Sequence, residues 1–198
     1  MKRIKYIILG LFLFSGVVGF GQGGYFSTTY NVAIPTGNTK SFTDRTSFRG
    51  YSLEAGGWIN DNVSLGFAFS WNGFYEETDY QIYELEDLTL WAKRWRYINA
   101  YPLMGTAKYY LNSESDFEPY AGAGIGFQIT HQETDFGMYS IVDKKWLFSM
   151  YPEIGFNYWF SQATALNFNM RYNWAAKGVN IESQSYLGFN IGFVFYSW

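Results

Sequence analysis

The chain has 198 residues, of which 23% are aromatic and only 16% are charged, and its formal net charge is −3. This length fits a single domain, and the acidic balance argues against a nucleic-acid partner. The chain contains no cysteine, which excludes a disulfide framework and a lipid-modified cysteine.

Residues 1–21 are predicted to be a secretory signal peptide. A basic start containing Lys2, Arg3 and Lys5 precedes an apolar run that ends at Phe20. The run is shorter than the roughly 20 apolar residues of a membrane-spanning helix, and small residues flank Phe20 before the expected cleavage ahead of Gln22. The leader carries three of the 14 basic residues and none of the 17 acidic ones, so the rest of the chain has a net charge of −6.

After the leader, eight segments alternate apolar and polar residues with a period of two. In one of them, Val63, Leu65 and Phe67 alternate with Ser64, Gly66 and Ala68. This period is typical of a β-strand whose two faces meet different surroundings. The expected strands are residues 24–35, 47–59, 63–75, 94–111, 118–131, 145–160, 164–174 and 185–198.

The two faces of these strands predict a membrane barrel. One face is aromatic and aliphatic, whereas the other is small or amide-rich with single charges, which suits lipid outside and a packed polar lumen inside. No apolar run after the leader reaches membrane-helix length, so a spanning structure must be a closed barrel. A soluble lipocalin-like barrel, the structural alternative, needs a water-facing surface, and neither face carries enough charges for one.

Short and long connections alternate between the strands. The short ones are 60–62, 112–117 and 161–163, and the long ones are 36–46, 76–93, 132–143 and 175–184. Bacterial barrels have short periplasmic turns and longer extracellular loops. We therefore predict an all-β, eight-stranded antiparallel up-and-down transmembrane β-barrel with four extracellular loops. The apolar residues retained in 76–93 suggest that this connection extends its hairpin above the membrane, and Pro102 predicts a bulge or local defect.

A few charges fall on the inward face of the strands. The hairpin 145–174 has even-numbered residues outward on both arms, so a three-residue turn that pairs Phe160 with Thr164 puts Glu153 opposite Arg171. Glu54 and Lys108 also face inward. We expect these four residues to form a charge network, because an unpaired buried charge is costly.

Outward aromatic residues cluster near both ends of the expected strands. Such rings prefer the headgroup region, so they predict two interfacial girdles. The residues are Trp71, Tyr75, Tyr97, Trp146, Tyr172 and Trp174 at the loop ends, and Tyr109, Tyr158 and Phe160 at the turn ends.

Several stretches resemble a known family. Residues 101–110, 118–127, 155–160 and 187–198 carry a likeness to the small eight-stranded outer-membrane barrels of the OmpA, OmpX and OmpW type, a porin-like group. The resemblance implies the outer membrane of a Gram-negative bacterium, contact with its lipid and lipopolysaccharide, and insertion by the barrel assembly machinery. It also implies a C-terminal assembly signal at Asn190, Gly192, Phe195 and Trp198, although Ser197 occupies the expected last aromatic site.

The first functional hypothesis is a non-enzymatic structural or surface-interaction protein, with an unknown protein partner bound through loops 76–93 and 132–143. The second is a narrow porin-like channel for small or hydrophobic solutes. Inward Trp58, Tyr120, Tyr151 and Trp159 favour a plugged lumen over that channel. A lipid A-modifying enzyme is the third.

No motif predicts a catalytic, cofactor or metal site. Gly122, Gly124 and Gly126 lack nucleotide-loop spacing and continue as a strand, so they are expected to make room for large lumen side chains. His131, with Ser140 and Asp135 nearby in sequence, is expected to be a solvated loop histidine rather than part of a triad. The acidic stretch 76–87 lacks EF-hand spacing and is expected to be a solvated face.

Overall fold

The computed structural model describes residues 23–85, 88–111, 115–137 and 139–197. The predicted signal peptide and Trp198 lie outside these residues. The described chain forms eight strands and one short helix, α2. Their bounds are β1 Gly24–Thr36, α2 Gly37–Phe42, β2 Gly50–Asn60, β3 Val63–Leu85, β4 Leu88–Tyr110, β5 Phe117–Asp135, β6 Ser140–Ser161, β7 Thr164–Ala175 and β8 Gln184–Ser197.

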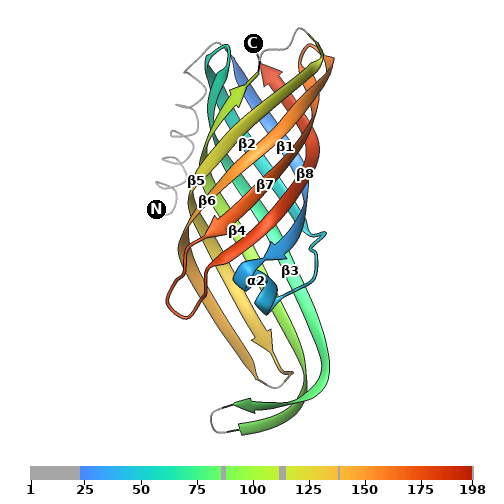
Figure 1. The fold of residues 1–198 in the computed structure, drawn as a ribbon, viewed down its shortest axis with the longest axis vertical. Coiled ribbons are helices and arrows are strands. Elements are labelled where there is room, and N and C mark those ends of the chain that lie inside the picture. The colour runs from blue at the N-terminus through green and yellow to red at the C-terminus, as the bar shows by residue number, and fades with distance from the viewer. Residues whose placement is uncertain (1–22, 86–87, 112–114, 138, 198) are drawn as a thin grey trace, which may run out of the picture.

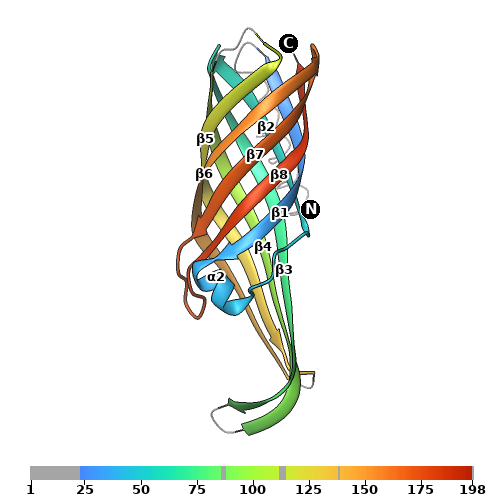
Figure 2. The same cartoon turned by 45° about the vertical axis from the view of Figure 1, so that its right-hand side comes forward.

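The strands form a closed antiparallel barrel in which each strand pairs with its neighbours in sequence. β1 completes the closure by pairing with β8, from Gly24 opposite Ser197 to Thr36 opposite Ser185. Figures 1 and 2 show the tilted strands and the long β3–β4 hairpin that projects beyond one end. The predicted fold class, an eight-stranded up-and-down barrel, is confirmed.

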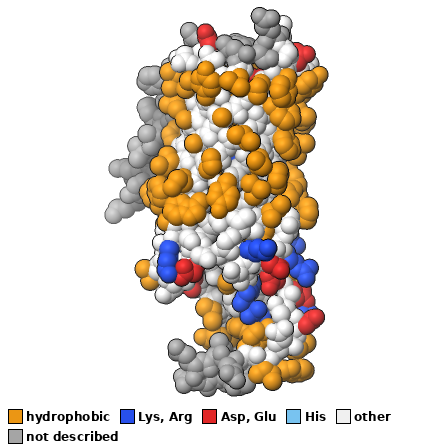
Figure 3. Space-filling view, viewed as in Figure 1, with side chains coloured by type: hydrophobic (Ala, Val, Ile, Leu, Met, Phe, Trp, Pro, Cys, Tyr) orange, Lys and Arg blue, Asp and Glu red, His pale blue; other side chains and the backbone are white. Residues whose placement is uncertain are grey.

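Side chains alternate between the lumen and the outer surface, as the period of two predicted. In β7, Asn167, Asn169 and Arg171 are buried, whereas Phe168 and Tyr172 between and beyond them are exposed. Phe67 on β3 is 61% exposed and Ile125 on β5 is 60% exposed. Figure 3 shows the resulting apolar belt around the barrel, with charged side chains gathered beyond one edge. An apolar surface this continuous suits lipid and not water.

The two short turns differ from the three-residue turns predicted. Asn60 pairs with Val63 and Ser161 pairs with Thr164, so each turn has two residues and the expected Phe160–Thr164 pair is wrong. Ile59 and Phe160 are the extra residues of two β-bulges. At the first turn the Asn60 Oδ1 atom accepts hydrogen bonds from the backbone N–H groups of Asn62 and Val63, at 3.0 and 2.9 Å. Because each bulge absorbs one residue, the pairing beyond it keeps the predicted register.

Two long connections are largely strand. β3 and β4 stay paired as far as Leu85 and Leu88, with a bulge between Thr78 and Gln81. β5 and β6 likewise reach Asp135 and Ser140. The prediction that 76–93 extends its hairpin is therefore confirmed, whereas the predicted loop 132–143 is mostly strand. Cross-strand pairing satisfies backbone groups that a loop would leave to water.

Two further local predictions concern the connection 36–46 and Pro102. The expected loop 36–46 contains the six-residue helix α2, and β2 begins at Gly50 rather than at Ser47. Pro102 causes no register shift, because Phe69 opposite Leu103 and Asn72 opposite Ala100 share one register. The β3–β4 ladder nevertheless lacks pairs between these two, where Tyr101 and Pro102 lie, so the predicted local defect is present without a bulge. Pro102 itself lies opposite Gln128 of β5. No helix among the described residues has the length and apolar sequence needed to cross a membrane.

An arginine in the belt distinguishes a lipid-facing surface from a water-facing one. Phe67 lies about halfway between the turn at Asn62 and Trp71, so Phe67→Arg should reduce the free energy of unfolding by about 2–4 kcal/mol in lipid vesicles. Tyr80, which is 59% exposed on the projecting hairpin, supplies the control, and Tyr80→Arg should be nearly neutral. Urea titration read by heat-modified gel mobility measures both. Equal, small effects would contradict a lipid-facing belt.

Candidate functional site: a charged lumen and a projecting ribbon

Four charged side chains on the inner face form one ion-pair network: Glu54 of β2, Lys108 of β4, Glu153 of β6 and Arg171 of β7. All four are buried. The Lys108 Nζ atom lies 2.7 Å from Glu54 Oε1 and 3.2 Å from Glu153 Oε1. The Arg171 Nη2 atom lies 3.2 Å from Glu54 Oε2, and Arg171 Nε donates to Glu153 Oε2. Each cation contacts both carboxylates, and two positive and two negative charges make the network formally neutral.

Strand register brings these residues together. The β6–β7 ladder places Glu153 opposite Arg171, as predicted from the parity of the two arms and their short turn. Gly122 of β5 lies between Lys108 on one side and Glu153 on the other. A Cβ atom at position 122 would approach Lys108 Cγ to 2.9 Å and Glu153 Cγ to 3.4 Å. The glycine therefore leaves the space in which these two side chains meet across β5.

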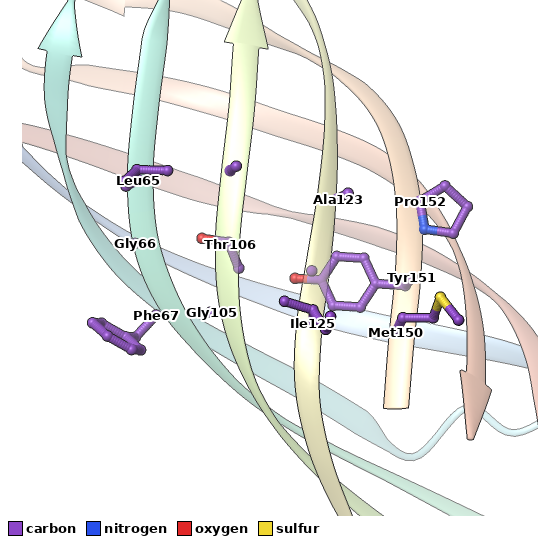
Figure 4. Close-up of a pocket in the computed structure, with 12 residues that line it drawn as sticks. Leu65, Gly66, Phe67, Gly105, Thr106, Ala123, Ile125, Met150, Tyr151 and Pro152 are labelled. Atoms are coloured by element: carbon purple, nitrogen blue, oxygen red, sulfur yellow. The ribbon is translucent and has the colours of Figure 1, made fainter. Parts of the chain in front are cut away.

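Tyrosines surround the network. The Tyr25 hydroxyl donates to Glu54 Oε1 at 2.7 Å, and the Arg171 guanidinium lies over the Tyr151 ring at 4.9 Å. Figure 4 shows the Tyr151 ring extending from β6 across β5 toward Thr106. A Cβ atom at Gly124 would lie 2.4 Å from that ring, so this glycine also makes room for a large lumen side chain. Sequence reasoning did not single out Tyr25, although its inward position in β1 was a usable signal.

Packed side chains occupy the lumen on both sides of the network. Toward the short turns, Trp58 packs on Tyr110 and Trp159 packs on Tyr196, with ring centroids 4.6 and 4.4 Å apart. Toward the loops lies an apolar cluster containing Phe74, Ile98 and Tyr186. On the inner face of β6, β7 and β8, hydrogen bonds between side-chain amides link Asn157, Asn167, Asn169 and Asn190. The lumen therefore resembles a protein core more than a channel.

The residues considered for catalysis or metal binding do not form a common site. His131 is not the solvated loop histidine that was predicted, because it lies in β5 opposite Lys144. Its Nε2 atom is buried and has no hydrogen-bond partner among the described residues. Ser140 donates to Glu133 at 3.1 Å, while Asp135 accepts from the Gly137 N–H at 2.7 Å. Glu76 accepts from the Asp44 N–H at 2.8 Å. Within the part of the chain that the structure describes, no group of three or more His, Cys, Asp or Glu residues has the arrangement of a metal site.

The predicted girdle residues lie on the outer surface. Trp146, Tyr109, Tyr158, Phe160 and Tyr172 are exposed, and the remaining predicted ones, Trp71, Tyr75, Tyr97 and Trp174, are half-buried. Some pack on other surface rings: Trp71 lies 5.8 Å from Tyr51, and Tyr75 lies 5.1 Å from Tyr97, between centroids. Figure 3 shows apolar side chains concentrated toward both edges of the belt.

The structure describes three residues of the predicted assembly signal, and each has a different environment. Asn190 is buried and donates to Asn169 Oδ1 at 2.5 Å. A Cβ atom at Gly192 would lie 2.0 Å from the Thr28 carbonyl oxygen, so close packing of β1 and β8 requires glycine there. Phe195 is exposed on the outer face. Trp198 lies outside the described residues.

A two-stranded ribbon, residues 76–85 of β3 and 88–96 of β4, projects at the end opposite the short turns (Figure 1). On one face, Tyr83 packs against Phe136 with ring centroids 5.2 Å apart, and the Arg94 guanidinium lies over the Tyr83 ring at 4.9 Å. The other face carries an ion pair between Glu77 and Lys93. Hydrogen bonds from Lys93, and then from Tyr75, lower the pKa of the Glu77 carboxyl.

No family model and no curated protein matches this sequence. The closed barrel, its apolar belt and its filled lumen define the class: the chain has the fold of the small eight-stranded outer-membrane β-barrels. Sequence similarity is too low to carry more than the fold.

Three solved structures illustrate this likeness. Neisserial surface protein A matches with a TM-score of 0.55 and 13% identity, over 88% of this chain and 96% of that one. Ail, the attachment invasion locus protein of Yersinia pestis, has a TM-score of 0.53 and 10% identity, over 88% and 96%. The outer membrane protein OprG from Pseudomonas aeruginosa has a TM-score of 0.51 and 12% identity, over 91% and 98%.

Removing one member of the lumen network should cost more than removing a matched pair. Arg171→Ala leaves two buried carboxylates with Lys108 alone, so we expect a loss of about 3–5 kcal/mol. The double variant Glu153→Gln plus Arg171→Met keeps the neutral Glu54–Lys108 pair and should be the more stable of the two. Heat-modified gel mobility over a urea series compares them. A double variant less stable than Arg171→Ala would refute the pairing.

Acid should loosen the ribbon near Glu77. Because the pKa of Glu77 is lowered in the fold, its ion pair stabilises the ribbon above the ordinary carboxyl range and is lost as the pH falls through that lowered pKa. Amide hydrogen exchange at Thr78 and Lys93, corrected for intrinsic rates, should therefore accelerate from neutral to strongly acid pH. Glu77→Gln should remove most of the pH dependence, and an unchanged profile in that variant would contradict the assignment.

Proposed function

We propose that this protein resides in the outer membrane of a Gram-negative bacterium and acts without catalysis, by binding a protein partner outside the membrane. The observation that carries the proposal is the ribbon of residues 76–85 and 88–96. Exposed apolar side chains that lie beyond the belt are not needed for contact with lipid. They are more readily explained by another macromolecule.

The ribbon offers open strand edges. β4 pairs with β5 only as far as Trp95 opposite Asp135, and the β2–β3 ladder ends at Gly50 opposite Asn72. Within the described residues, the outer part of the ribbon therefore has no strand beside either edge. Unpaired backbone N–H and C=O groups at such an edge can add a strand from another chain.

The outer face of the ribbon carries an aromatic patch. Tyr80, Ile82 and Trp91 are 59%, 68% and 71% exposed. The Tyr80 and Trp91 rings stack with centroids 4.9 Å apart, and Ile82 is the cross-strand partner of Trp91. Tyrosine and tryptophan contribute strongly to protein interfaces. A ribbon that carries this patch can therefore serve as a docking element.

The rest of the structure supports this ranking of functions. A lumen filled with rings, amides and paired charges disfavours the channel hypothesis, and the dispersed partners of Ser140 and Asp135 disfavour a hydrolytic triad. Ail, a protein of this fold named for attachment and invasion, has also been solved in complex with the heparin analogue sucrose octasulfate. That ligand is bound by Ail, and for this chain it supports only the proposal that a barrel of this fold can bind a partner.

The proposal includes how the protein reaches its membrane. Residues 1–21 would direct export, and Asn190, Gly192, Phe195 and Trp198 would be read by the assembly machinery. The aromatic girdles would then set the depth of the barrel in lipid, including lipopolysaccharide.

Site-specific cross-linking tests the docking element. A photoreactive residue replacing Trp91 in intact cells should give discrete adducts with a protein partner. The control replaces Val179, which is 73% exposed in the β7–β8 connection, and should give fewer adducts. Tyr80→Ser plus Ile82→Ser should abolish binding of the partner so identified without changing heat-modified mobility.

Other outcomes would overturn the proposal. Equal adducts at positions 91 and 179 would show that the ribbon is not selective. Conductance of purified protein in planar bilayers, well above that of the lipid alone, would favour the channel. Altered lipid A masses on expression would favour the enzyme.

A further inference from the structure

The two edges of the ribbon carry opposite charges. The part of β3 in the ribbon, residues 76–85, has no lysine or arginine and contains the acidic residues Glu76, Glu77, Asp79 and Glu84. The part of β4 in the ribbon, residues 88–96, has no acidic residue and contains the basic residues Lys93, Arg94 and Arg96. A strand that joins the β3 edge therefore meets a different charge from a strand that joins the β4 edge.

The β3 edge has backbone groups directed away from β4. The Gly73 N–H donates to the Arg49 carbonyl at 2.8 Å, so Gly73 faces the side of β3 on which β2 lies. Backbone direction alternates along an antiparallel strand, which gives Glu77 the same orientation. The bulge that follows adds one residue to β3, so Ile82 takes the parity of Glu77. The β2–β3 ladder ends before these two residues, and Figures 1 and 2 show the ribbon extending beyond the barrel.

The cations of β4 are already engaged within the protein. Lys93 forms the ion pair with Glu77, and the Arg94 guanidinium lies 4.9 Å above a tyrosine ring. Arg96 Nη1 donates to the Phe42 carbonyl at 3.0 Å, and its guanidinium lies 4.9 Å above the ring of the same residue. All three cationic side chains are half-buried. The β4 edge therefore offers a partner little charge that is not already in contact.

Asp79 places an exposed negative charge beside the β3 edge. Its side chain is 97% exposed, and its Oδ1 atom lies 3.9 Å from Lys93 Nζ, whose closer partner is Glu77. Asp79 lies in the bulge, next to Tyr80 of the aromatic patch. An open edge beside a negative charge and an apolar patch is complementary to an extended segment with a cation and apolar side chains. The same charge repels the β3 edge of a second copy, as charged edge residues do.

We propose that the ribbon binds an extended basic segment of a protein partner, which pairs as an added strand with the β3 edge at Glu77 and Ile82. A lysine or arginine of that segment lies beside Asp79, and an apolar side chain lies beside Ile82 in the patch. This inference rests on the function proposed above and adds to it the edge that is used and the charge of the partner.

Short peptides test the inference on the barrel in lipid nanodiscs. The probe is an eight-residue peptide with threonine at alternate positions, and its other positions carry two lysines followed by two valines. Threonine and valine favour extended backbone, and a second peptide of reversed sequence covers the other strand direction. Binding of at least one of them should protect the backbone amides of Glu77 and Ile82 from hydrogen exchange, measured by nuclear magnetic resonance. The amide of Trp91, on the β4 edge, should be unaffected.

Altered peptides and variants separate charge from strand pairing. Glutamate in place of lysine should weaken binding, and methylation of every backbone amide should abolish it, because such a peptide has no N–H to donate. Asp79→Lys should weaken binding of the lysine peptide by about threefold to tenfold and should favour the glutamate peptide. Asp61→Lys makes the same change at an exposed position in the β2–β3 turn, at the opposite end of the barrel, and should leave binding unchanged.

Three results would overturn the inference: equal affinity for the lysine and glutamate peptides, protection at Trp91 instead of Ile82, or no binding of either lysine peptide. If cross-linking at Trp91 still identifies a partner, the proposed function stands, and only the assignment of edge and charge fails. Equal adducts at positions 91 and 179 remove the proposed function itself, whether or not the peptides bind.

Discussion

Closure of the sheet is the constraint on which the rest of this structure depends. A lipid-facing backbone has no water to satisfy its N–H and C=O groups, so β1 must find β8 along its length, as it does from Gly24 to Thr36. The close approach of these two strands is possible because Gly192 lacks a side chain next to the Thr28 carbonyl. Once the barrel is closed, the period of two assigns each residue to lipid or to lumen.

A closed barrel of eight strands is just wide enough to be filled by its own side chains. This chain fills the lumen with groups of opposite kinds: aromatic rings toward the turns, four paired charges in the middle and an apolar cluster toward the loops. The charges tolerate burial because each cation is shared by two carboxylates, and because Gly122 and Gly124 leave space for Lys108 and Tyr151. Because the lumen is filled, a partner can bind only outside it. The ribbon, the surface proposed for this role, lies at the loop end beyond the belt.

At that end the ribbon combines two kinds of surface. Its outer face is apolar, and its β3 edge sets an exposed carboxylate beside unpaired backbone groups. The two are adjacent, so different parts of one extended partner can contact both. The apolar residues kept in 76–93 predicted the extended hairpin, whereas α2 lies in a stretch without apolar periodicity and was not predicted.

The sequence by itself determined the strand number, the direction of each face and the inward charges, because alternation is a local pattern that survives in any closed barrel. Parity and a short turn together also predicted that Glu153 faces Arg171, and the pairing holds because the bulge at Phe160 compensates for the shorter turn. Only the tertiary structure decided that Lys108 reaches Glu153 across Gly122, that bulges at Ile59 and Phe160 shorten the turns, and that α2 packs beside β8. These features depend on side-chain reach across strands and on hydrogen bonds between segments far apart in the chain, such as Thr39 with Ser185, and a periodic pattern holds no information about either.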